Sequence, residues 1–230
     1  MIDPALRSEA LALAEAIAPE VFDSALYLLD RAELTRPWPN DCLAYCGPTD
    51  KFSCDYLAAK NKWHGHGVLI AVDFTRFAED HPENRRWAFL NLFLHELAHG
   101  VPAPPPRAET DDAEIAALLT RLESERYERA AAQAEKTMNE TDSDHGFRFL
   151  RTVIHLWYRA LTSGFFGHLD AIMGPMYGIA SMARYVEALG DEPRRMFAET
   201  FGHIQATKPP AAFSALWTNE LSRAKRSKQC

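Results

Sequence analysis

Two neighbouring stretches decide the fold: VLIAVD at residues 68–73 and RWAFLNLFLHELAH at residues 86–99. The first is short, apolar and rich in β-branched side chains, which predicts a buried strand. The second is apolar on nearly every side, as expected of a helix that lies within a core. Before it, residues 80–83 (DHPE) have the spacing of a capping box and indicate where the helix begins. A strand followed by a buried helix predicts an α+β fold.

The rest of the chain is predominantly helical by pattern. Ala and Leu recur at helical spacing over residues 4–34, which predicts one or two helices. Residues 35–65 are interrupted by Pro and Gly and are expected to be irregular. Because an isolated strand is unstable, we expect partner strands for 68–73 within residues 40–57. An amphipathic helix is expected over residues 143–162.

The chain of 230 residues is long enough to bury a core of its own. We expect a single domain, 1–230, with a small β-sheet and a core near 66–157. A charged helical insertion occupies about 103–140, with a long helix at 110–137 that would be a lid or a partner surface. The C-terminal part, 165–230, predicts three or four further helices.

Charge and hydropathy limit the classes of partner. The chain has 25 Lys and Arg against 32 Asp and Glu, a net charge of −7, which argues against nucleic-acid binding. The first twenty residues include acidic side chains and do not have the pattern of a signal peptide. The sequence contains no run of 18 or more apolar residues, so no membrane-spanning helix is predicted. We therefore expect a cytoplasmic protein.

The motif HExxH, at His95, Glu96 and His99, indicates metal chemistry. Side chains at i and i+4 share one helix face, so the two imidazoles can bind one zinc ion. Zinc lowers the pKa of its bound water, and the neighbouring carboxylate of Glu96 can accept the proton. Burying three ionisable side chains in an apolar helix is costly unless a metal compensates.

Three arrangements compete for the third protein ligand that a catalytic zinc site needs. A metzincin requires Gly and His where this chain has Pro102 and Pro105, so that arrangement fails. A gluzincin would use a glutamate of a later helix. The candidates are Glu114, Glu123, Glu125 and Glu128. We favour His145, in the segment SDHGFRF at 143–149, because it opens an amphipathic helix whose apolar face can anchor it to the core.

HELAH followed by D-H-G-x-x-F resembles the SprT-like group of minimal zincin metallopeptidases over about residues 66–157. The resemblance implies a zincin-like core with His95, His99 and His145 as zinc ligands and Glu96 as general base. The chain departs from the group in its long spacing between His99 and His145. SprT-like proteins, which act near DNA, often carry a C-terminal cysteine zinc ribbon, whereas residues 165–230 of this sequence are expected to be helical and contain Cys230 as their only cysteine.

The resemblance also implies a substrate-binding strand. In such zincins an edge strand near the active helix holds the substrate by β-augmentation. We expect residues 68–73 to be that strand, with Val68 and Ile70 in contact with the substrate. A group that stabilises the oxyanion is also expected. The candidates are Tyr177, which we include among the substrate-binding residues, His155 and His203.

Three further groups stay undecided between a chemical and a structural role. They are His64 with His66, Cys42 with Cys46 and Cys54, and Asp142 with Asp144. The histidines would form a second metal site, line the cleft, or lie exposed in a Gly-rich turn. The cysteines would bind zinc or be reduced thiols in a loop, which we favour. The aspartates would cap a helix or orient a ligand imidazole.

These observations together predict a zinc metallopeptidase, an endopeptidase with one catalytic Zn²⁺ and a protein or peptide as its substrate. Two alternatives remain. One is a catalytically inactive, zinc-stabilised binding or scaffold protein. The other, which the resemblance implies and the net charge disfavours, is a DNA-associated SprT-like protease.

Overall fold

The computed structural model describes residues 1–23, 25–34, 43–49, 51–77, 81–101, 145–165, 167–173 and 182–227. Within these ranges the chain is a mixed α+β protein, mostly helical with one three-stranded sheet, which confirms the predicted class. The insertion at 103–140 and its helix at 110–137 lie outside the described residues. No described helix has the length and apolar character needed to cross a membrane.

The sheet consists of β1 (Leu26–Asp30), β2 (Ala44–Pro48) and β3 (Val68–Val72), in the order β1-β3-β2. β3 pairs in parallel with β1 and antiparallel with β2. The strand predicted at 68–73 and a partner within 40–57 are therefore confirmed. The prediction that residues 4–34 are all helical is wrong for β1. Its leucines favour helices locally, but their burial in the sheet overrides that preference.

The central position of β3 corrects a second prediction. We expected an edge strand that could pair with a substrate, but β3 is hydrogen-bonded to a strand on each side. Its side chains are buried as well, with Val68 5% and Ile70 0% exposed. A strand that is buried on both faces has a continuous run of apolar residues in its sequence, and this is the pattern from which β3 was predicted. Val68 and Ile70 are therefore core residues that cannot contact a substrate strand.

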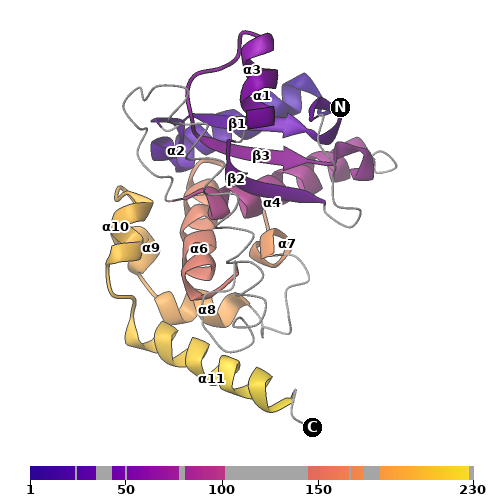
Figure 1. Cartoon of the computed structure of the whole chain (residues 1–230). Helices are drawn as coiled ribbons and strands as arrows, with labels where there is room; N and C mark the ends of the chain where they lie inside the picture. The colour runs from indigo at the N-terminus through magenta and orange to yellow at the C-terminus, as the bar shows by residue number, and fades with distance from the viewer. Residues whose placement is uncertain are drawn as a thin grey trace.

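Helices cover both faces of the sheet (Figure 1). The N-terminal helical elements are α1 (Pro4–Ile17), α2 (Pro19–Asp23), η1 (Arg31–Glu33), α3 (Lys51–Ala59), η2 (Phe74–Phe77) and α4 (Pro82–Gly100). The buried helix predicted before residue 99 is thus α4, although its N-cap is His81 and not the predicted capping box at residue 80. α3 corrects the expectation that residues 35–65 are irregular. It packs on the face of the sheet opposite to α4.

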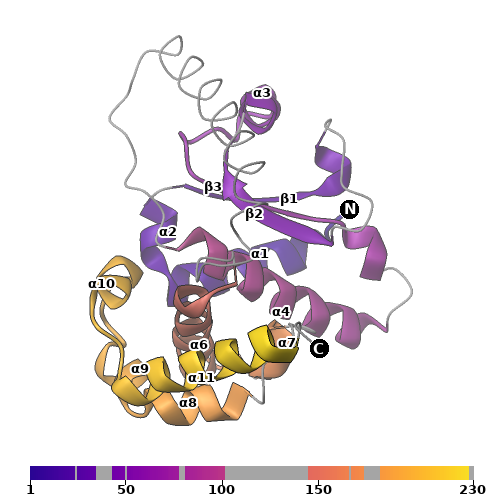
Figure 2. The same ribbon diagram turned by 60° about the horizontal axis from the view of Figure 1, so that its bottom comes forward.

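The C-terminal helices pack on the far side of α4 from the sheet (Figure 2). They are α6 (Phe147–Thr162), α7 (Leu169–Met173), α8 (Met182–Leu189), α9 (Glu192–Arg195), α10 (Phe201–Ala206) and α11 (Ala211–Ser227). α6 begins four residues after the expected start at 143, so His145 precedes the helix. Beyond residue 165 the described part of the chain has five helices, where three or four were predicted.

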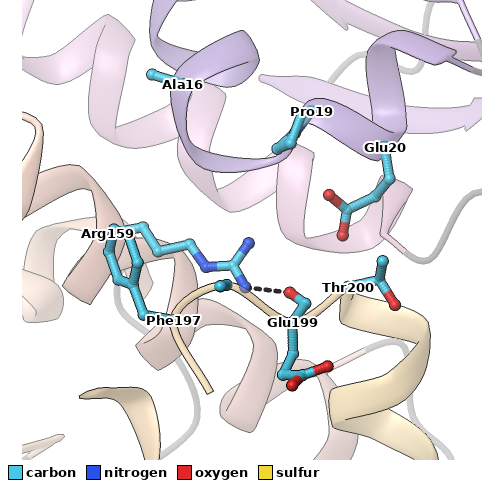
Figure 3. Close-up of a pocket in the computed structure, with 8 residues that line it drawn as sticks. Ala16, Pro19, Glu20, Arg159, Phe197, Glu199 and Thr200 are labelled. Atoms are coloured by element: carbon cyan, nitrogen blue, oxygen red, sulfur yellow. Dashed lines mark hydrogen bonds between the residues drawn. The ribbon is translucent and has the colours of Figure 1, made fainter. Parts of the chain in front are cut away.

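A cavity of about 250 Å³ lies where α1, α2, α6 and the segment before α10 meet (Figure 3). Arg159 of α6 and Glu20 of α2 point toward each other across it. The guanidinium of Arg159 donates to the carbonyl oxygens of Ile17, Met196 and Glu199. Arg159 therefore ties the end of α1 to the segment between α9 and α10, and this cavity includes none of the HExxH residues.

Candidate metal centre

The last two turns of α4 hold the HExxH residues against the sheet. Leu94 and Leu97 are fully buried and fix which face of the helix points into the core. Gly100 allows a close approach, since a Cβ atom there would lie 2.7 Å from Cγ1 of Val68 and 3.3 Å from Sγ of Cys46. The sequence thus places the end of α4 directly beside β3 and β2.

The structure brings the three histidines named from the sequence together. Nε2 of His145 lies 3.1 Å from Nε2 of His95 and 3.2 Å from Nε2 of His99. The three ring nitrogens lie within 4.8 Å of one another, as a group that could hold a metal ion requires. The segment before α6, separated from α4 by more than forty residues, thus supplies the third imidazole as predicted.

Hydrogen bonding and burial leave the imidazoles ready to act as ligands. Nδ1 of His95 lies 2.9 Å from the carbonyl oxygen of Ile172, and since a carbonyl only accepts, Nδ1 must carry the proton. When the ring is neutral, its Nε2 therefore carries no proton and has a lone pair that can bind a metal ion. Burial, with the neighbouring imidazoles adding to it, lowers the pKa of His95 to about 4 and that of His99 to about 3. Both rings are therefore neutral at pH 7.

These donors fit zinc. Neutral nitrogen lone pairs that face one another at 3.1–3.2 Å repel unless a proton or a cation lies between them. Ligand nitrogens held tetrahedrally at the usual Zn–N distance lie about 3.3–3.4 Å apart. The observed separations are close to that value, and three protein ligands would leave one coordination position open.

Glu96 follows His95 in the sequence of α4 and is only 6% exposed. Burial raises the pKa of its carboxyl to about 7. The negative charge of Glu96, after burial, also raises the pKa of the Cys46 thiol, which places this residue of β2 within electrostatic reach of the carboxylate. A carboxyl that titrates near neutral pH can both accept and donate a proton.

Phe149, in the first turn of α6, lies against the three imidazoles. Its ring stacks on His99 with centroids 4.2 Å apart and also contacts His95 and His145. From the sequence, Phe149 is expected to be an apolar residue of the helix and is the last position of the segment D-H-G-x-x-F. Its place in that segment, four residues after His145, is the signal that could have indicated a role at the site.

The two described oxyanion candidates, His155 and His203, are not part of this site. His155 is fully buried and lies 3.0 Å from a carboxylate oxygen of Glu192. His203 is an exposed residue of α10 whose ring lies 3.9 Å from Glu199. Tyr177 lies outside the described residues.

The described members of the undecided groups do not join a metal site either. His64 is exposed, and Nδ1 of His66 lies 3.4 Å from the hydroxyl of Thr49. Cys46 and Cys54 form no disulfide with each other, and the metal-binding group found among the described residues includes none of these four side chains. The remaining candidates lie outside the described ranges. They are Cys42, Asp142, Asp144, Glu114, Glu123, Glu125 and Glu128.

Comparisons of the chain with protein-family models, curated proteins and solved structures found no match. The interpretation of the site therefore depends on its own residues and their geometry.

Proposed function

We propose that the chain is a zinc-dependent metallopeptidase, an endopeptidase with a zincin-like core of the kind that SprT-like proteins have. The observation that carries this proposal is the convergence of His95, His99 and His145, with the buried Glu96 next to His95 in the same helix. Three neutral nitrogen donors with an open fourth position are typical of catalytic zinc sites and not of structural ones.

A bound zinc ion would polarise a peptide carbonyl and activate a water molecule for attack. The three imidazoles would hold the ion. The carbonyl of Ile172 would keep His95 in the tautomer that presents Nε2 to it.

Glu96 would move the proton that peptide hydrolysis requires. The reaction takes a proton from the attacking water and delivers one to the leaving amine. Because burial raises the pKa of this carboxyl, Glu96 would be a stronger base than an exposed glutamate, and it could take up the proton of the water and pass it on.

The test compares the wild type with Glu96→Gln for bound zinc and for cleavage of a diverse peptide mixture, followed by mass spectrometry. Glu83→Gln, an exposed change in the first turn of the same helix, is the matched control. We expect Glu96→Gln to keep its zinc and lose cleavage by about 10²–10⁴-fold, the range for a general base, while the control cleaves normally.

Cleavage by Glu96→Gln at the wild-type rate would contradict the proposal. Zinc binding without cleavage by the wild type would favour the zinc-stabilised scaffold instead. Adding DNA at low salt to the same assay tests the third alternative, since a DNA-associated protease would be stimulated.

A further inference from the structure

The aromatic ring of Phe149 contacts all three imidazoles of the candidate metal centre. The ring of Phe149 lies parallel to that of His99, with centroids 4.2 Å apart and planes 26° apart. The ring centroids of His95 and His145 lie 5.0 Å and 4.9 Å from it, at steep angles. Phe149 itself is buried, so its ring is held in place by the core.

The histidines differ in what else orients them. His95 is oriented by its hydrogen bond to the carbonyl oxygen of Ile172. In the described part of the chain, Nδ1 of His99 forms no comparable hydrogen bond, and its Nε2 faces only His145. The rings of His95 and His145 meet the His99 ring edge-on, and Phe149 is the ring that stacks on its flat face, so we take this stacking to set the plane of the His99 ring.

The first turn of α6 is anchored from its other side as well. Helix α6 starts after Gly146, which has no side chain to cap it. Phe147 packs instead against two aromatic rings of α11, with centroids 5.2 Å from Phe213 and 6.4 Å from Trp217. The turn that carries Phe149 and follows His145 is thus clamped between the histidines and the C-terminal helix.

We propose that Phe149 is a positioning residue that holds the imidazoles, His99 above all, in the metal-binding arrangement before the metal arrives. Its ring acts through the ligands and contributes no donor atom. This inference rests on the proposed function only in taking the three histidines as the metal ligands. It names a residue whose removal should weaken metal binding although all three ligands remain.

The test uses Phe149→Leu and Phe149→Met, two apolar side chains of similar size that lack a flat ring. Zinc affinity is measured by chelator competition, and Co²⁺ absorption reports the ligand geometry. Groups that orient metal ligands typically contribute 10–100-fold to affinity, so we expect a loss of about that size in both variants. We also expect a weaker and shifted Co²⁺ spectrum.

Phe201→Leu is the matched control, because Phe201 is an equally buried phenylalanine on α10 whose ring lies against Arg159. Thermal unfolding of the metal-free proteins shows how far each change destabilises the fold. We expect the control to lose stability but to keep the zinc affinity and Co²⁺ spectrum of the wild type. If Phe149→Leu fails to fold, Phe149→Met still tests the proposal, because the flexible methionine side chain adapts more easily to the core.

Wild-type affinity and an unchanged Co²⁺ spectrum in the Phe149 variants would overturn the positioning role and leave the metal site intact. An equal loss of affinity in Phe201→Leu would overturn it too, since the effect would then follow stability alone. Failure of the wild type to bind either metal would overturn the proposed function itself, so the two failures are distinguishable.

Discussion

Replacing Glu192 by Gln should destabilise the fold strongly, because its carboxylate is the partner of a buried guanidinium. Nε of Arg151 donates to the carboxylate at 2.8 Å, and Nε2 of His155 lies 3.0 Å from the same oxygen. All three side chains are at most 3% exposed. α6 carries the two basic residues, so this cluster fastens the C-terminal part of the chain to the helix that bears Phe149.

The size of the effect follows from burial. Removing one partner of a buried ion pair leaves the other charge uncompensated and costs about 3–5 kcal/mol. Domains have a total stability of only about 5–15 kcal/mol, so this is a large fraction. For a chain of this length the loss corresponds to a decrease in the melting temperature of about 6–20 °C.

Urea denaturation at pH 7, followed by circular dichroism, measures the difference directly. The matched control is Glu187→Gln, the same change at an exposed position of α8, which should alter stability by less than about 0.5 kcal/mol. If Glu192→Gln lies within about 1 kcal/mol of the control, the carboxylate is not compensating a buried charge and the reasoning is refuted.

Three further predictions concern the scaffold. Burial lowers the pKa of His155. At Glu192 burial acts to raise the pKa, but the hydrogen bonds from His155 and Arg151 outweigh it and lower the pKa. At these two sites the folded state therefore binds fewer protons than the unfolded one. Stability should therefore fall from about pH 6.5 downward, which urea denaturation between pH 8 and pH 4 checks; a flat profile would contradict it. Gly100→Ala should lower stability by about 1–2 kcal/mol, because the overlap of its Cβ with Val68 outweighs the gain in helix propensity. In a double-mutant cycle, Gly100→Ala should cost less in a Val68→Ala background than in the wild type, whereas strict additivity of the two changes would exclude the overlap. Arg159→Lys should cost about 2 kcal/mol in denaturation experiments, because an ammonium cannot reproduce the planar fork that serves three carbonyls; an unchanged midpoint would contradict it.

Local patterns were sufficient to predict the elements that carry the site. The apolar run at 68–73 and the apolar helix that ends at His99 have clear periodicities, and both are present as β3 and α4. The pairing of His145 with the HExxH histidines was also predictable, because a zinc site needs a third donor and the alternatives lacked either a matching residue or a reason to select one.

What the sequence could not reveal depends on contacts between distant residues. β1 was missed because a Leu-rich strand has no local signal that distinguishes it from a helix. The central position of β3, which removes Val68 and Ile70 from any substrate site, is a property of strand order and not of the strand itself. The contacts of Phe149 with the histidines were hidden for the same reason, since they join residues of α4 and α6.

The most direct test of the central claim is the zinc content per chain of the wild type and of His145→Ala, measured side by side by elemental analysis. His64→Ala, which removes an exposed histidine, is the control. We predict one zinc per chain in the wild type and in the control, and loss of most of it in His145→Ala. Absence of zinc from the wild type after zinc is supplied, or full retention of zinc by His145→Ala, would contradict the three-histidine site.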